Sequence, residues 1–140
     1  MEIEKIFDII IYESNNFVVS QDWEIPIPGF FVIGAKRKIN SIMDFTEKES
    51  REFIDLLVKV RKGMNDVLGI NEVYLFQNED SEHNFHLWIF PRLRWMDKFG
   101  RKIESVRLIM DYAKENMINE QVINEVKEVA SKMKEYMGEN

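Results

Sequence analysis

Both histidines of the chain lie in residues 82–92, so any chemistry that needs an imidazole must take place there. This stretch has the aromatic content and the alternation of a β-strand. A strand would place Asn84, His86, Trp88 and Phe90 on one face, with residues 85, 87 and 89 on the other. His83 is an odd number of positions from His86, so we expect it to face the opposite side, unless a bulge intervenes, or to lie in a loop. A neutral imidazole is a nucleophile near pH 7, which makes His86 the candidate reactive residue.

Two simpler interpretations of these histidines remain open. A lone histidine in an aromatic strand can be a hydrogen-bonded residue of the core. A metal site at His83 and His86 is not expected, because the two side chains diverge on a strand and the chain has no cysteine.

Composition describes one globular domain over residues 1–140, with 45% hydrophobic residues and only three prolines. No apolar run is long enough for a membrane span or a signal peptide, and we expect a cytoplasmic protein without a membrane partner. The net charge of -6 argues against nucleic acid as a general partner. Local basic patches remain at residues 36–38 and 92–102.

The elements that would position His86 follow from hydrophobic periodicity. Thr46 and Glu49 form a capping-box signature, and apolar residues then recur at helical spacing until Gly69. Asn119 is expected to begin the last helix. Strands are predicted over residues 6–12, 17–20, 30–33, 73–76 and 85–90, and further helices over 103–116 and 122–137.

The predicted fold class is α+β. It comprises an antiparallel sheet of about five strands, one long central helix and a two-helix C-terminal extension. The core would span residues 6–92 and the extension residues 103–138. Between the second and third strands, residues 22–29 contain two prolines and a glycine, which prevent a regular ladder. Irregular backbone beside a sheet is a common place for a ligand.

Over residues 6–92 the chain resembles the histidine triad (HIT) superfamily of nucleotide-binding hydrolases and transferases. The resemblance depends on the order and spacing of several pieces: an aspartate before a Pro-rich crossing, Pro-Gly leading into a strand, Lys-Arg at its end, a capped helix, a strand ending in Asn, and an alternating strand ending in Pro-Arg. They correspond here to residues 17–22, 28–33, 36–37, the helix after Thr46, residues 74–78 and residues 84–92.

The resemblance implies that His86 is the middle histidine of the triad and the nucleophile. It would attack the α-phosphorus of a purine nucleotide, such as a dinucleoside polyphosphate or a nucleoside phosphoramidate, to give a nucleotidyl-imidazole intermediate. The other three histidine positions hold Phe30, Asn84 and Trp88. Trp88 offers an N–H donor and no acid–base function, so a substrate with a good leaving group would depend least on the lost residues.

The resemblance also assigns nucleotide-binding roles. Asp22 would accept hydrogen bonds from the ribose, and Trp23 would flank the base, although Asp22 could equally cap the Pro-rich turn and Trp23 could be ordinary core. Asn78 and Ser81 would contact the phosphate. Asn84 would partly replace the first histidine of the triad, and Trp88 would line the nucleotide site.

Three acids, Glu79, Asp80 and Glu82, lie in the loop where the phosphate is expected. No resident cofactor is expected, but a polyphosphate substrate would need a divalent cation or the basic stretch around Arg92 to offset this charge. The resemblance further implies a homodimer through the long helix and an adjoining strand. The rival functions are a nucleotide-binding module without catalysis and an interaction protein on the same scaffold. The segment from Leu93 onward has no counterpart in the motif, and it could set specificity by closing over the pocket or over the partner's.

Overall fold

The computed structural model describes residues 7–138 and contains a five-stranded antiparallel sheet in the order β1-β2-β3-β5-β4. The strands are β1 (Ile10–Glu13), β2 (Phe17–Gln21), β3 (Phe31–Ala35), β4 (Val73–Phe76) and β5 (His86–Pro91). They confirm the predicted strands to within a few residues. The first prediction began at Ile6, which lies outside the described residues, and the ladder with β2 is irregular between Ile10 and Tyr12. The α+β fold class is therefore confirmed.

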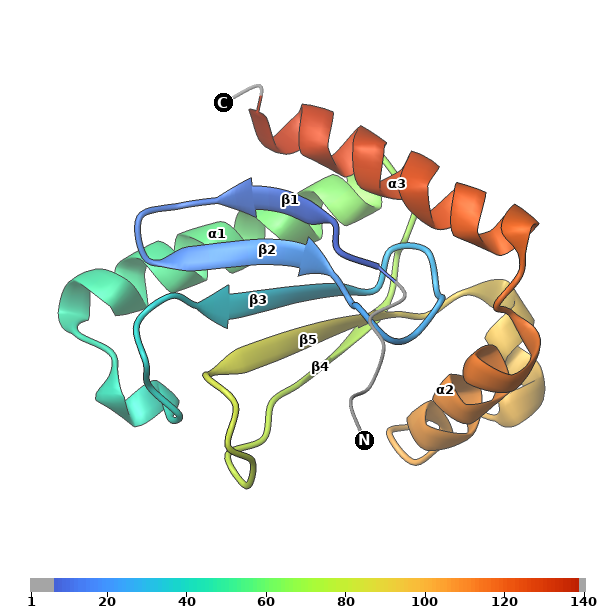
Figure 1. Cartoon of the computed structure of the whole chain (residues 1–140), viewed down its shortest axis with the longest axis horizontal. Helices are drawn as coiled ribbons and strands as arrows, with labels where there is room; N and C mark the ends of the chain where they lie inside the picture. Colours follow the sequence, from blue (N-terminus) through green and yellow to red (C-terminus); the bar gives the residue numbers. More distant parts are fainter. Residues whose placement is uncertain (1–6, 139–140) are drawn as a thin grey trace.

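The long helix α1 (Glu47–Asp66) lies behind the sheet in Figure 1. Its start is the predicted capping box, because the Thr46 hydroxyl accepts from the Glu49 backbone N–H and the Glu49 carboxylate accepts from the Thr46 N–H. After the helix, Gly69 adopts a φ of 69°, a left-handed conformation that glycine tolerates best. Phe53, Val60 and Met64 bury the inner face of α1 against the sheet.

The C-terminal extension consists of α2 (Ser105–Asn116) and α3 (Glu120–Gly138), preceded by the short helix η2 (Arg94–Phe99). The predicted start of the last helix is confirmed, since the Asn119 side chain accepts a hydrogen bond from the Val122 N–H. Helix α3 lies beside β1 and α1 (Figure 1), and its Ala130, Met133 and Met137 belong to the same core as the inner face of α1. Both methionines of α3 are therefore packing residues.

Two hydrophobic clusters form, one on each face of the sheet. Phe31, Ile33 and Ile89 contribute to the cluster under α1 and α3. Phe90 points to the opposite face, where it packs with residues of α2. The predicted alternation along β5 is thus confirmed, and it leaves His86 on the face away from α1.

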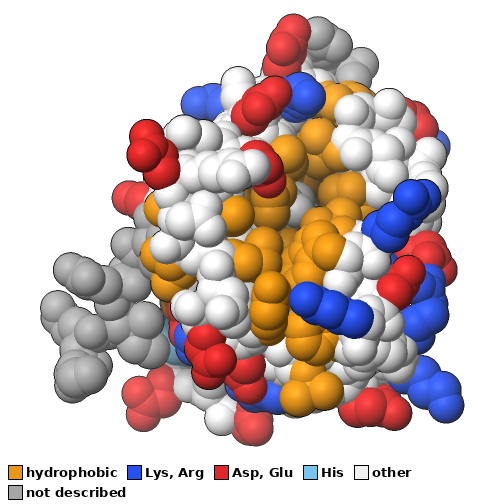
Figure 2. All heavy atoms as spheres, turned by 90° about the vertical axis from the view of Figure 1, so that its right-hand side faces the viewer, with side chains coloured by type: hydrophobic (Ala, Val, Ile, Leu, Met, Phe, Trp, Pro, Cys, Tyr) orange, Lys and Arg blue, Asp and Glu red, His pale blue; other side chains and the backbone are white. Residues whose placement is uncertain are grey.

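The end of the molecule that carries α2 presents a band of hydrophobic side chains with charged side chains on both sides (Figure 2). Exposed apolar residues of the extension are Ile103, Leu108 and Ile118. Within residues 7–138, no helix combines the length and the apolar character that crossing a membrane requires.

Candidate active site

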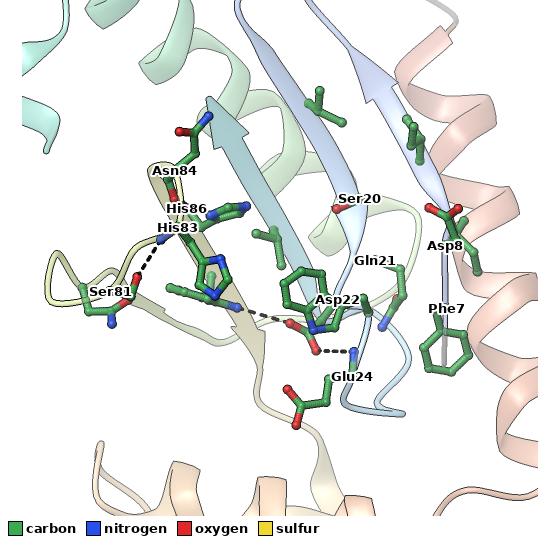
Figure 3. Close-up of a pocket in the computed structure, with 17 residues that line it drawn as sticks. Phe7, Asp8, Ser20, Gln21, Asp22, Glu24, Ser81, His83, Asn84 and His86 are labelled. Atoms are coloured by element: carbon green, nitrogen blue, oxygen red, sulfur yellow. Dashed lines mark hydrogen bonds between the residues drawn. The ribbon is translucent and has the colours of Figure 1, made fainter. Parts of the chain in front are cut away.

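A pocket of about 230 Å³ opens on the sheet face that carries His86 (Figure 3). Its floor comes from alternate residues of three neighbouring strands: Val18 and Ser20 of β2, Val32 of β3, and His86 and Trp88 of β5. The Pro-rich crossing after β2 and the loop before β5 form opposite walls, and residues 7–10 complete the rim. All seven residues predicted for the site line this pocket: Asp22, Trp23, Asn78, Ser81, Asn84, His86 and Trp88.

The two ring nitrogens of His86 have different surroundings. Its Nδ1 lies 2.5 Å from the backbone carbonyl oxygen of Asn84. A carbonyl can only accept, so Nδ1 carries the proton and the lone pair of the neutral ring belongs to Nε2. Among the described residues, Nε2 has no hydrogen-bond partner. Burial lowers the pKa of His86 below its ordinary value, although the hydrogen bond to Asn84 acts in the opposite direction.

The imidazole of His86 lies against Gly34 of β3, its cross-strand partner. A Cβ atom at position 34 would come within 3.2 Å of Cδ2 and 3.3 Å of Nε2 of the ring. These distances are tighter than ordinary van der Waals contact, so the absence of a side chain at Gly34 lets the ring occupy this position.

Asp22 is buried and accepts hydrogen bonds from three residues. Its Oδ2 accepts the backbone N–H groups of Glu24 at 3.1 Å and Ile25 at 2.9 Å, and its Oδ1 accepts the indole N–H of Trp88 at 3.2 Å. The interpretation of Asp22 as the cap of the Pro-rich turn is therefore confirmed. An ionised carboxylate has about four acceptor positions, which leaves room for one more donor, such as a ribose hydroxyl. Burial raises the pKa of Asp22, although these N–H donors favour the ionised form.

The two tryptophans of the predicted site make different ring contacts. Trp23 is half-buried on the crossing, and its indole meets the ring of His83 edge to face, with 6.2 Å between ring centres. Trp88 stacks on Phe76 of β4 at 5.7 Å and lies 6.0 Å from the ring of His86. Trp88 is thus both a hydrogen-bond donor and a wall of the pocket.

The residues predicted to contact the phosphate differ in exposure and in the hydrogen bonds that they already make within the protein. Asn78 and Ser81 are exposed in the loop before β5, where the Asn78 amide donates to Asp80 at 2.7 Å. Asn84 lines the pocket, but its amide donates to the backbone carbonyls of Ala35 and Arg37. The side chain of Asn84 therefore holds the loop onto the end of β3, and its backbone carbonyl orients His86.

The structure decides between alternatives that the sequence left open for His83 and Arg92. His83 lies in a loop, as one alternative stated, because β5 begins only at His86, and this loop brings His83 back over the pocket. Arg92 cannot compensate the acidic loop, since its guanidinium is buried and donates to Ser105, Met96 and Gly100 in the C-terminal segment. In the part of the chain that the structure describes, no three His, Cys, Asp or Glu side chains converge as a metal site would require.

Gln21 and His83 are among the pocket residues that sequence reasoning missed. Gln21 is buried, and its amide N–H donates to the Ile27 carbonyl, which helps to shape the Pro-rich crossing. His83 was expected to face away from His86 or to lie in a loop, and it was given no place in the site. The signal for His83 was its closeness in sequence to His86, but loop geometry was needed to show that both rings reach one pocket.

No protein-family profile matches the sequence, and no curated protein sequence matches it significantly. Solved structures do match. A hypothetical histidine triad nucleotide-binding protein from Sulfolobus tokodaii superposes with a TM-score of 0.63 at 14% identity, over 93% of this chain and 83% of that one. A zinc-bound histidine triad family protein from Mycobacterium smegmatis gives a TM-score of 0.62 at 12% identity, over 94% and 87% of the two chains.

A Hit-like protein from Bartonella henselae, described as involved in cell-cycle regulation, superposes with a TM-score of 0.61 at 15% identity, over 96% of this chain and 88% of that one. That structure contains an unknown ligand. Together these similarities show that the chain has the fold of histidine triad proteins.

Proposed function

We propose that this chain is a HIT-like nucleotide hydrolase or nucleotidyl transferase that acts at the α-phosphate of a purine nucleotide. The observation that carries the proposal is the orientation of His86, whose Nδ1–H donates to the Asn84 carbonyl and whose Nε2 is unpartnered among the described residues that form the pocket. One protein with this fold is described as a hypothetical histidine triad nucleotide-binding protein, which supports a nucleotide as the ligand.

The reaction would proceed in two displacements. The Nε2 lone pair forms a bond to the α-phosphorus while the bond from phosphorus to the leaving-group oxygen or nitrogen breaks. The oxygen of water or another acceptor then attacks the phosphorus and gives up its proton to solvent, while the P–N bond breaks and the imidazole returns to its neutral form. The Asn84 carbonyl would stabilise the positive ring of the intermediate through Nδ1–H.

The other residues would bind the substrate. Asp22 has one acceptor position left for a ribose hydroxyl, and Trp23 would flank the base beside the N-terminal rim of the pocket. Asn78 and Ser81 would donate to the phosphate oxygens. A polyphosphate substrate would bring a divalent cation to offset Glu79, Asp80 and Glu82, since Arg92 is buried elsewhere.

The test uses chromatography to measure the AMP released from diadenosine tetraphosphate and from adenosine phosphoramidate. We expect His86→Ala to abolish turnover and to keep nucleotide binding. His83→Ala is the matched control, because His83 is exposed and has a ring contact with Trp23 but no hydrogen bond to a backbone carbonyl that would orient it. Turnover retained by His86→Ala would refute the assignment.

The alternative is a nucleotide-binding module without catalysis. Phe30 supports it, because this residue is buried in the second hydrophobic cluster and contacts Phe90 edge to face at 5.1 Å, so no titrating group stands there. Binding of AMP with no product from native protein would favour this alternative. No binding of any nucleotide would favour an interaction protein.

A further inference from the structure

The end of the pocket opposite His86 carries two polar side chains that make no hydrogen bond or ion pair with any described residue. Ser20 of β2 is half-buried, and Asp8 on the N-terminal rim is exposed. In Figure 3, Ser20 lies between His86 and Asp8. The nearby carboxylate of Glu24 is instead paired with Lys114 of α2, at 2.7 Å. Ser20 and Asp8 are therefore free to bind a ligand.

The pairing of the N-terminal rim with the chain after β2 brings Asp8 to the pocket. Two backbone hydrogen bonds of 3.0 Å extend this pairing, from the Phe7 N–H to the Trp23 carbonyl and from the Gln21 N–H to the Ile9 carbonyl. In the same register, Ile10 pairs with Ser20. Asp8 therefore stands opposite Asp22, on the face that forms the pocket. Two acids at opposite positions are unfavourable for the strand pair itself.

The path across the sheet from His86 to Asp8 matches a nucleotide in length. His86 lies on β5, which is followed in the sheet by β3, by β2 and by the strand that continues the N-terminal rim. Neighbouring strands are about 4.8 Å apart, so three spacings give about 14 Å. A nucleotide with its phosphate at His86 and its ribose at Asp22 reaches Asp8 with the outer edge of its base.

The chemistry of a carboxylate distinguishes between the two purines. An ionised carboxylate has two oxygens that only accept hydrogen bonds. The outer edge of guanine offers two adjacent donors, N1–H and the N2 amino group, which match these oxygens. Adenine has an acceptor at N1, so its lone pair would face the negative charge. The Ser20 hydroxyl can donate or accept and therefore suits either base.

We propose that Asp8 binds the outer edge of the base and makes the pocket selective for guanine nucleotides over adenine nucleotides. This inference rests on the proposed function, because it assumes a nucleotide with its phosphate at His86. Adenine nucleotides are weaker ligands of the same pocket. The N-terminal rim thereby determines which purine is preferred.

The experiment measures the affinities of GMP, IMP and AMP by isothermal titration calorimetry. We expect native protein to bind GMP about tenfold or more tighter than AMP. IMP keeps N1–H and lacks the amino group, so its affinity should lie between the two. Asp8→Asn replaces one acceptor by a donor, and an amide can pair with N1 and the N6 amino group of adenine. The ratio of GMP to AMP affinity should fall by about tenfold or more in this variant.

Asp44→Asn is the matched control, because Asp44 is exposed, does not line the pocket and changes the net charge by the same amount. Equal affinity of native protein for GMP and AMP would overturn guanine selectivity and leave the proposed function standing. An unchanged ratio in Asp8→Asn, or an equal change in both variants, would have the same meaning. Selective binding of GMP without turnover of diguanosine tetraphosphate would overturn the proposed catalysis alone, and no binding of any of the three nucleotides would overturn both.

Discussion

At the scale of single residues, the proposed mechanism depends on the protonation state of His86. Nε2 would have to be unprotonated to attack phosphorus, and burial lowers the pKa of this ring. The arrangement therefore keeps the proposed nucleophile neutral at pH values where a solvent-exposed histidine would begin to carry charge.

We predict that kcat/KM declines at acid pH with an inflection that lies below pH 6.5, the ordinary pKa of histidine. The same shift affects stability: the folded state binds the proton less readily than the unfolded chain, so stability is lost as pH falls from 6.5 toward the lowered pKa. A pH–rate profile measures the acid limb. NMR titration of the His86 ring measures the pKa shift from which the loss of stability follows. An inflection at or above pH 6.5 would contradict the prediction.

The close contact between Gly34 and His86 leads to a second prediction. Gly34→Ala would place a methyl group 3.3 Å from the Nε2 position, so the ring must shift by a few tenths of an ångström. Misplacement of a nucleophile lowers rate steeply, and we expect kcat to fall by about tenfold or more while the fold is retained.

The matched control is Gly138→Ala, because a Cβ atom at Gly138 would have no heavy atom within 4 Å. Turnover and circular dichroism of the two variants provide the comparison. Equal activity of Gly34→Ala and native protein would show that the position of the ring does not depend on this contact.

At the scale of elements, the first turn of α1 is joined to the segment after β3. Arg37 donates to both carboxylate oxygens of Glu49, at 3.1 and 2.8 Å, and also to the Asp44 carbonyl. The hydrogen bonds that Glu49 accepts from Arg37 and from the Thr46 N–H lower the pKa of Glu49 to about 2. Glu49 thereby connects the capping box to the chain that leaves β3.

We predict that Glu49→Gln destabilises the protein by on the order of 1–3 kcal/mol near pH 7. The folded-state pKa lies below the ordinary value, so the contribution is present above pH 4.5 and is lost as pH falls toward 2. Chemical denaturation at several pH values measures it, and the difference from native protein should shrink below pH 4.5.

Glu47→Gln is the control for this prediction, because Glu47 lies in the same turn and pairs with Arg51 while exposed to solvent. We expect a change of less than about 0.5 kcal/mol for this variant. Equal stability of the Glu49→Gln and Glu47→Gln proteins at pH 7 would contradict the assigned role.

At the scale of the whole molecule, one side of the sheet leaves apolar groups exposed beside an edge strand. Leu75 of β4 is 49% exposed and pairs with Ile89, so it points to the face covered by α1. Ile54 and Val58 are exposed on α1. Arg61, on the same face of that helix, donates to the carbonyls of Ile70 and Asn71, which precede β4.

We predict that the protein is a homodimer through β4 and this face of α1, because a self-complementary contact would cover both the edge strand and the apolar groups. Light scattering should show a dimer for native protein and a monomer for Leu75→Lys. Leu108→Lys on α2, where the leucine is 55% exposed, is the control and should remain dimeric. A native monomer would contradict the prediction.

The sequence by itself determined the elements and the face on which His86 lies. Hydrophobic alternation along β5, the Thr46 and Glu49 capping box, and the prolines of the crossing each act over a few residues, so they can be interpreted without tertiary structure. The order of these elements also predicted the fold, and every residue predicted for the site lines the pocket.

Only the tertiary structure decided what these residues do to one another. The Trp88 indole binds Asp22 from 66 positions away, Arg92 turns into the C-terminal core, and α2 brings Lys114 to Glu24 of the crossing. Such contacts depend on how loops close and on how helices pack across the sheet. These long-range contacts leave no periodic pattern in the sequence, because the same local pattern permits many long-range partners.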